Sequence, residues 1–308
     1  MDKIDYKPLV AIHCLVYNHE TYLRDCFEGF VMQQTNFPFV AIVHDDASTD
    51  GSAAIIREYE EKYPHIFKPI YEIENQYSKR DGSLERIMNE AIEATSVKYV
   101  AMCEGDDYWT DPLKLQKQVD FLEANIEYSI CFHNVNTLIQ KTGEVKDEFL
   151  VRDMPERSTI WDLAEGNYIH TPSVLYRREK LDFNKLKKML PCLPLDYVMW
   201  MLLAEKGDIY KFKEPMAVYR LGSGIWESSS SIKRYILTIT TLSKLSFIFS
   251  DKEKVLILNN IAKLQEELME IIQQKDQQLY MIQHSLSFRI SKCVLKPIKV
   301  VRDLILKR

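Results

Sequence analysis

The sequence lacks any run of 18 consecutive apolar residues, so no segment is predicted to cross a bilayer as a simple helix. The first eight residues contain no apolar stretch like that of a signal peptide, and none is expected. Internal repeats are also missing. The 308 residues are therefore a poor match to membrane-spanning, secreted or repeat-built proteins.

Cysteine pairs that would suggest a metal or redox site are absent as well. None of the six cysteines forms a C-x-x-C motif or clusters with histidine, and most lie in apolar surroundings typical of buried free thiols. We therefore expect a reduced, cytoplasmic protein. The cysteines are Cys14, Cys26, Cys103, Cys131, Cys192 and Cys293.

An overall surplus of positive charge is missing too, since the net charge is −5, and nucleic acid is not expected as a partner. Residues 285–308 differ, because they hold seven basic residues and one acidic residue. Their net charge of +6 leaves −11 for the rest of the chain. Hydrophobic residues make up 46%, which is enough for one large α/β domain with an appendage.

Apolar runs typical of buried strands alternate with helical patterns along the first half of the chain. This alternation predicts a mostly parallel sheet with helices on both faces. Expected strands lie at 9–17, 38–43, 67–73, 97–103, 128–138, 173–176 and 216–219, and expected helices at 20–33, 52–63, 83–94, 115–124, 196–205, 232–249 and 252–282.

Acidic residues follow two of the predicted strands. Glu104-Gly105-Asp106-Asp107 comes directly after one, and Asp45-Asp46 after another. Ligands of such sheets bind beyond the carboxyl ends of the strands. Carboxylates that lie close together there could bind Mg²⁺ or Mn²⁺, with phosphate oxygens as further ligands. Asp46 could accept hydrogen bonds from a nucleotide base or ribose. The alternative for each segment is a set of solvated acids and helix caps, and we favour a capping role for Asp111.

Four segments together resemble the family-2 glycosyltransferases of the GT-A fold, a Rossmann-like α/β fold, and in particular bacterial enzymes of cell-surface polysaccharide synthesis. They are VAIHCLVYNHE, Gln33-Gln34-Thr35, HDDASTDGS and CEGDDYWTDPLKLQKQV, and the match extends over about residues 8–226. The resemblance implies an inverting, metal-dependent enzyme that moves a sugar from a nucleotide-sugar donor to a carbohydrate acceptor, either free or lipid-linked.

The resemblance also implies roles for single residues. Tyr17 and Asn18 would line the nucleotide pocket, Asp46 would read the base, and Asp106 would lie near the ribose and diphosphate. Asp107 would bind the metal, with Glu104 either sharing this work or only ending the strand. Arg220, in a segment that resembles a loop over the donor phosphates, would neutralise their charge, the alternative being an ordinary ion pair.

The general base and the acceptor side are expected further along the chain. Asp196 precedes an apolar helix at the position where the family has an acid that deprotonates the acceptor hydroxyl; the alternative is a helix cap. His170 would contact the acceptor, although a structural histidine is an equally good interpretation. No covalent intermediate is required in this scheme, so inversion would follow.

We expect the chain to consist of a catalytic domain (1–226), a helical extension (227–284) and a basic amphipathic tail (285–308). Apolar residues from Ile257 to Ile271 recur at coiled-coil spacing, which predicts either a homo-oligomer through 252–284 or packing on the catalytic domain. The tail resembles a helix that lies on anionic lipid at the inner face of the cytoplasmic membrane. Packing on the domain is its alternative.

Rival functions explain less of the sequence. A nucleotidyltransferase would need a glycine-rich basic loop after the first strand, which is missing. A catalytically inactive nucleotide-sugar-binding protein would not require all of the acids. A membrane scaffold would use the tail but leave the acidic strand ends unexplained.

Overall fold

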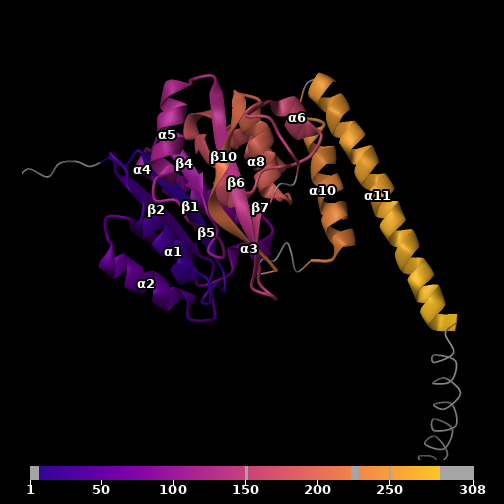
Figure 1. The fold of residues 1–308 in the computed structure, drawn as a ribbon, viewed down its shortest axis with the longest axis horizontal. Helices are drawn as coiled ribbons and strands as arrows, with labels where there is room; N and C mark the ends of the chain where they lie inside the picture. Colours follow the sequence, from indigo (N-terminus) through magenta and orange to yellow (C-terminus); the bar gives the residue numbers. More distant parts are fainter. Residues whose placement is uncertain (1–6, 150–151, 223–228, 250, 285–308) are drawn as a thin grey trace, which may run out of the picture.

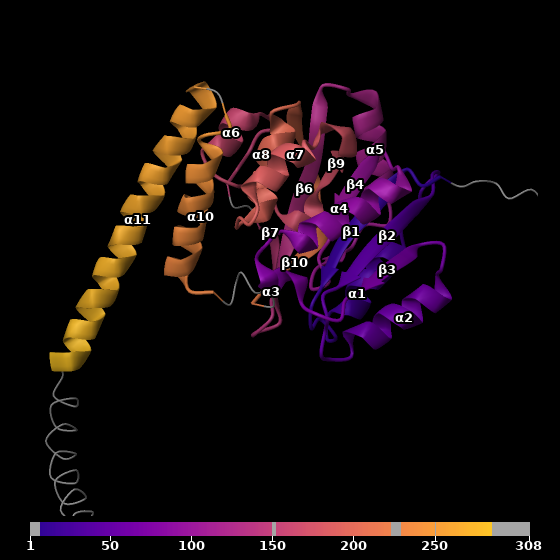
Figure 2. The ribbon, with the colours of Figure 1, turned by 180° about the vertical axis from the view of Figure 1, so that it is seen from behind.

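The computed structural model describes residues 7–149, 152–222, 229–249 and 251–284. All ten strands in these ranges belong to one sheet, in the order β3-β2-β1-β4-β9-β6-β10-β5, with β7 beside β6 and β8 beside β10. Helices cover both faces of the sheet, as Figure 1 and Figure 2 show from opposite sides. The predicted α/β architecture with C-terminal helices is thus confirmed.

The first half of the sheet is parallel, as expected. β1 pairs with β2 on one side and β4 on the other, and β3 follows β2, all in parallel. Side chains of β1 alternate between the two faces, because successive residues of a strand point in opposite directions. The strands are β1 (Val10–Val16), β2 (Phe39–Asp45), β3 (Phe67–Tyr71) and β4 (Tyr99–Met102).

The second half is mixed, because β9 runs antiparallel to both β4 and β6, while β6 and β10 are parallel. β10 begins well before the expected 216–219, in a stretch whose charged residues interrupt the apolar pattern. β7 was not predicted, since its exposed residues are mostly charged. The strands are β5 (Tyr108–Trp109), β6 (Tyr128–Ile139), β7 (Glu144–Phe149), β8 (Arg157–Ser158), β9 (Leu175–Arg177) and β10 (Asp208–Leu221).

Two hydrophobic cores fill the space between the sheet and its helices. One core lies under α1 (Leu23–Val31), α2 (Ser52–Lys62) and α5 (Lys114–Ala124). The other lies under α4, α6, α7, α8, α10 and α11. Every residue of α8 from Tyr197 to Ala204 is buried, which agrees with the apolar side chains on all faces of this part of the helix. The remaining bounds are α3 (Gln76–Lys79), α4 (Ser83–Thr95), α6 (Ile160–Ala164), α7 (Phe183–Met189), α8 (Leu195–Ala204), α10 (Ser231–Leu245) and α11 (Asp251–His284).

The start of α11 packs on the domain. Ile257 and Ile261 are buried in the same core as α8, and Leu264 packs against it, so this part of the predicted seam faces the protein itself. Beyond these residues α11 extends away from the body (Figure 1), and Met269 is about half exposed. The predicted domain boundary at Trp226 and the whole tail 285–308 lie outside the described residues. Within the described ranges, no helix is both long and apolar enough to span a membrane.

Candidate functional site

Three loops meet where the parallel strands end. β1, β2 and β4 are neighbours, so their carboxyl ends lie at the same edge of the sheet. The pairing continues past the strands: the Asp46 N–H donates to the carbonyl of Val16 at 2.9 Å, and the Gly105 N–H donates to that of Leu15 at 3.0 Å. A Cβ atom at Gly105 would lie 2.8 Å from Nδ1 of His19, so only glycine allows the two loops to approach this closely. Both acidic segments therefore open onto one site.

The loops after β1 and β2 are tied together by reciprocal hydrogen bonds. The Asn18 N–H donates to the Ser48 hydroxyl at 3.0 Å, while the Asn18 side-chain oxygen accepts from the Thr49 N–H at 2.7 Å. Asn18 adopts a left-handed conformation with φ of 57°, which asparagine tolerates better than most residues. Its side chain thus shapes the loop. Tyr17, the other residue predicted to line the nucleotide pocket, is half-buried beside it.

Asp46 is buried and accepts hydrogen bonds at both carboxylate oxygens. Oδ1 accepts from the Gln76 N–H and Oδ2 from the Tyr77 N–H at 3.0 Å, so the carboxylate caps the start of α3. Each oxygen has a second lone pair. The carboxylate can therefore fix α3 and also accept from a ligand.

The Glu104–Asp107 segment concentrates negative charge. Burial and the nearby charge of Asp106 raise the pKa of Asp107 well above its ordinary value, and Asp107 is 2% exposed. The pKa of Glu104 is raised to about 8. The causes are loss of hydration next to the protein and the charges of Asp106 and Asp196, although part of this side chain is exposed to solvent. Such shifts mark carboxylates that lack a compensating cation.

Arg220 lies beside this segment but is already engaged. Its backbone N–H donates to Oδ1 of Asp107, and its guanidinium contacts the Asp25 carboxylate and lies 4.9 Å from the ring of Tyr108 and 5.1 Å from that of Tyr22. The side chain is 7% exposed, so this ion pair is largely buried and does not lie on the surface. Arg220 links the end of β10 to Asp25 in α1 and to the acidic segment.

Asp196 lies in the first turn of α8, near enough to the acidic segment for its charge to contribute to the raised pKa of Glu104. Its Oδ1 accepts from the Tyr197 N–H at 2.8 Å, and burial raises its pKa to about 6. Asp196 and Glu104 thus lie within electrostatic range of each other. Asp196 is not the N-cap residue of α8, because Pro194 occupies that position.

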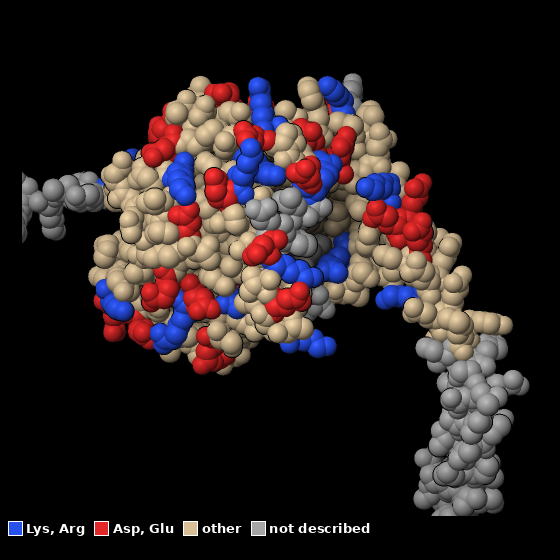
Figure 3. Space-filling model, in the orientation of Figure 1, with Lys and Arg blue, Asp and Glu red and all other residues tan. Residues whose placement is uncertain are grey.

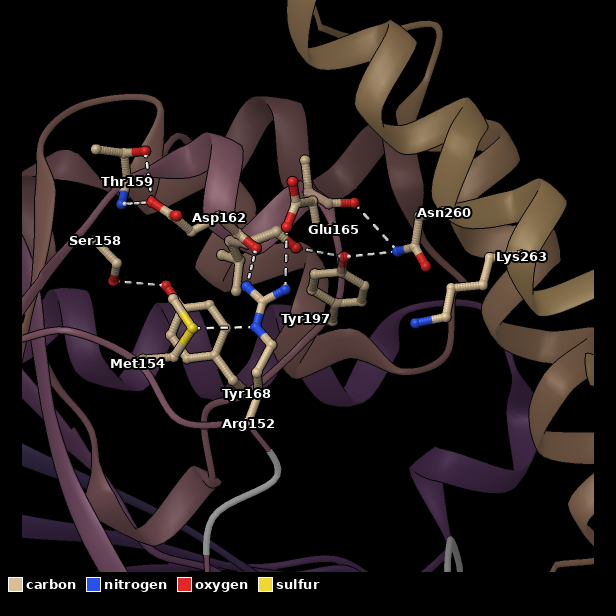
Figure 4. A network of polar contacts seen from close by, with 12 residues as sticks. Arg152, Met154, Ser158, Thr159, Asp162, Glu165, Tyr168, Tyr197, Asn260 and Lys263 are labelled. Atoms are coloured by element: carbon tan, nitrogen blue, oxygen red, sulfur yellow. Dashed lines mark hydrogen bonds and ion pairs between the residues drawn. The ribbon is translucent and has the colours of Figure 1, made fainter.

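α8 is fixed by polar contacts that include α11, drawn in Figure 4. The Tyr197 hydroxyl donates to the Leu163 carbonyl at 2.6 Å, and the buried Asn260 amide donates to the Ala164 carbonyl at 3.2 Å. Asn260 also lies 3.4 Å from the Tyr197 hydroxyl. The C-terminal helix thus contacts the residue next to Asp196.

His170 is mostly buried, with its ring 4.9 Å from that of Tyr219, and burial lowers its pKa to about 4. Two residues near the site were not predicted from the sequence. His19 lies beside Gly105, and Lys114 is fully buried with its ammonium 2.7 Å from Oε1 of Gln118. Burial lowers the pKa of Lys114 to about 7. Nothing in the local pattern around Lys114 distinguishes it from a surface lysine.

Within the described ranges, no group of three or more histidine, cysteine or acidic residues is arranged to enclose a metal ion. Mg²⁺ and Mn²⁺ sites that serve phosphates need only one or two carboxylates, because substrate oxygens and water complete the shell. The raised pKa of Asp107 fits a carboxylate that would gain from such an ion. The residues therefore fit a metal that is shared with a substrate.

Comparisons with known proteins identify the family of this chain. The family described as "Glycosyl transferase family 2" matches residues 12–183. An uncharacterised protein of Mycobacterium tuberculosis is 37% identical over 226 residues, 73% of this chain and 62% of its own length. The putative teichuronic acid biosynthesis glycosyltransferase TuaG of Bacillus subtilis is 29% identical over 219 residues, 70% of this chain and 81% of its own.

Solved structures show the same fold at low sequence identity. Staphylococcus aureus TarS 1–349 in complex with UDP-GlcNAc has a TM-score of 0.61 and 16% identity, over 83% of this chain and 71% of the 1–349 chain. A mannosyltransferase of Pyrobaculum calidifontis, in complex with GDP-Man and Mn²⁺, has a TM-score of 0.56 and 14% identity, over 93% of this chain and 83% of its own. With more than half of its residues matched by the family, the chain belongs to glycosyl transferase family 2.

Proposed function

We propose that this protein is an inverting glycosyltransferase that moves a sugar from a nucleotide-diphosphate sugar to a carbohydrate acceptor in the synthesis of a surface polysaccharide. One observation carries the proposal: Asp196, in the first turn of α8, lies close enough to the Glu104–Asp107 segment for its charge to raise the pKa of Glu104. A donor diphosphate at the acidic segment would then have a base on its acceptor side. The relationship to TuaG supports the polysaccharide role.

In the proposed reaction the acceptor hydroxyl loses its proton to Asp196. The oxygen forms a bond to the anomeric carbon while the bond from that carbon to the diphosphate oxygen breaks, and the electron pair leaves with the nucleoside diphosphate. A pKa of about 6 keeps Asp196 ionised at neutral pH and basic enough to accept the proton. A direct displacement inverts the anomeric centre.

Asp107, with Asp106 beside it, would hold Mg²⁺ or Mn²⁺ together with the diphosphate, and the ion would supply positive charge to the leaving group. The complex of the Pyrobaculum mannosyltransferase with GDP-Man and Mn²⁺ supports this choice. Asp46 and Tyr17 would contact the nucleoside. Asn18 and Arg220 would act by positioning the loops around it, because their side chains already bond within the protein.

The experiment is a panel of nucleotide sugars, UDP-GlcNAc and GDP-Man among them, incubated with the full chain and Mn²⁺, Mg²⁺ or chelator. Release of nucleoside diphosphate from one donor, lost with chelator, is the expected result. Release of inorganic pyrophosphate would instead indicate a nucleotidyltransferase. Binding of a donor without turnover, even with a range of saccharide acceptors, would indicate an inactive binding protein.

A further inference from the structure

We propose that the groove between α3 and α10 binds a phosphate group carried by the acceptor, and so selects a phosphate-bearing acceptor over a neutral one. The inference rests on the proposed function, because it names the substrate class of that same site. It is drawn from the shape and charge of the groove and from its distance to Asp196 along the chain. None of these features is part of the donor site.

The groove has a volume of about 380 Å³. One wall is formed by α3 and the residue that follows it, the opposite wall by α10, and the floor by the loop that precedes α8. The lining residues are Tyr77, Arg80, Pro191, Cys192, Leu193, Ser229, Lys233, Leu237, Thr240, Thr241 and Lys244.

Three cations line this groove: Arg80 from one wall, and Lys233 and Lys244 from the other. Among the described lining residues none is acidic, and none of the three cations forms an ion pair with another described residue. Figure 3 shows basic side chains beside a hollow between the body of the protein and the C-terminal helices. Three cations in the lining of one groove favour an anionic ligand.

The groove is held firmly at its floor. The Thr241 hydroxyl donates to the Leu193 carbonyl at 2.6 Å and lies 3.2 Å from the Leu193 N–H, and the Lys244 ammonium donates to the Pro191 carbonyl at 3.2 Å. An ammonium has three donors, so Lys244 keeps two for a ligand. These bonds fix α10 to the loop that leads into α8.

The floor also leads to the proposed base. Leu193 is three residues before Asp196, and the charges of Glu85, Lys244 and Asp196 all influence the Cys192 thiol, whose pKa burial raises to about 12. Glu85 lines a smaller adjoining recess, where burial raises its pKa as well. An acceptor anchored at α10 would therefore extend toward Asp196 and pass Glu85. Because its pKa is raised, Glu85 becomes neutral at a higher pH than an ordinary glutamate does.

The number of cations favours phosphate over carboxylate. A carboxylate carries one charge, whereas a diphosphate or a phosphodiester chain offers several charged oxygens that three separate cations can share. Leu237 and Leu193 add apolar surface for a carbon chain attached to the phosphate. The inferred ligand is thus a phosphate with a saccharide on one side, reaching Asp196, and a carbon chain on the other.

The test titrates the full chain with decyl diphosphate in chelator, and compares the wild type with Lys233→Gln/Lys244→Gln. The matched control is Lys68→Gln/Lys275→Gln. Like Lys244, Lys68 donates to a proline carbonyl (Pro64, 2.6 Å), and like Lys233, Lys275 is exposed on a C-terminal helix. We expect the groove variant to bind at least ~10-fold more weakly and the control to bind as the wild type does, since two charge-assisted contacts are lost only in the former.

Further arms separate the explanations. UDP should not compete with decyl diphosphate, and decyl maltoside should bind the wild type and the groove variant alike. Donor hydrolysis by the groove variant should remain at the wild-type rate. Equal affinity of wild type and variant for the diphosphate would overturn the inference, and so would competition by UDP, which would place the probe in the donor pocket.

A vesicle arm tests a lipid surface as the ligand of the groove. If the groove variant loses binding to phosphatidylglycerol vesicles but keeps its affinity for decyl diphosphate, the cations contact a membrane and the inference is wrong. The failure of the proposed function looks different. In that case no donor is turned over by the wild type, whereas the titration with decyl diphosphate still reports on the groove.

Discussion

The backbone N–H of Arg220 donates a hydrogen bond to Oδ1 of Asp107 at 2.8 Å, across 113 positions of the sequence. The bond joins the end of β10 to the acidic segment after β4, although these two strands are not neighbours in the sheet. It engages Oδ1 of the carboxylate within the protein. The acid is thereby oriented before any ligand arrives.

Asp107→Asn tests the metal assignment. The amide oxygen of the substituted side chain can still accept from the Arg220 N–H, and removing a buried charge with a raised pKa relieves like-charge repulsion. We expect Tm at pH 7 to stay level or rise, while turnover falls at least ~10²-fold for loss of metal-assisted catalysis. Thermal unfolding and donor turnover with graded Mn²⁺ provide the measurements. Wild-type turnover by the variant, or indifference of the wild type to chelator, would remove Asp107 from this role.

Asp196→Asn tests the general base and its pH dependence. Because the base must be ionised, wild-type kcat should rise with pH and level off above the pKa of about 6. The variant should keep donor affinity, lose ~10²–10⁴-fold in rate and show no such rise. The folded-state pKa of Asp196 exceeds its ordinary value, so this group favours folding at low pH and loses that contribution as pH rises through about 6. The variant should therefore unfold at an equal or higher temperature than the wild type at pH 8.

The result against this assignment is a variant with weak donor binding and an unchanged rate per bound complex. Asp196 would then be a structural residue of the first turn of α8.

Asn260→Leu tests the link between α11 and α8. The change leaves the Ala164 carbonyl without its partner and removes the neighbour of the Tyr197 hydroxyl. We expect a loss of about 1–3 kcal/mol in the free energy of unfolding, the usual cost of an unsatisfied buried group. Asn259→Leu is the matched control, because Asn259 is exposed on the same helix. Equal effects of the two substitutions in denaturant titrations would mean that the Asn260 contacts contribute nothing specific.

The tail 285–308 lies outside the described residues, and its predicted membrane role is tested by truncation. The full chain should sediment with vesicles that contain anionic lipid, whereas a chain that ends at His284 should stay in solution. Each basic residue near an anionic surface contributes about 1 kcal/mol, so seven suffice for binding. Neutral vesicles are the control. If the full chain stays in the supernatant with every lipid, the tail has no such role.

Much of the fold could be predicted from local patterns. The apolar runs of β1, β2 and β4 and the helical spacing in α2 and α4 identified the parallel half of the sheet to within a few residues. β7 and the first half of β10 were missed, because exposed or charged strands carry no clear alternation. The seam of α11 was ambiguous, since the same spacing serves a coiled coil and a helix packed on its own domain.

The α/β alternation, the acids at the strand ends and the resemblance to family 2 could be read from the sequence, because each depends on short runs of neighbouring residues. Only the folded chain shows which distant groups lie in contact, namely Arg220 with Asp25 and Asp107, and Asn260 with Tyr197, and that Asp196 comes within electrostatic range of Glu104. It also decided that the Arg220 guanidinium is engaged within the protein. Local periodicity fixes which face of an element is buried, but the partner across the core depends on how all the elements pack, and no single segment encodes that.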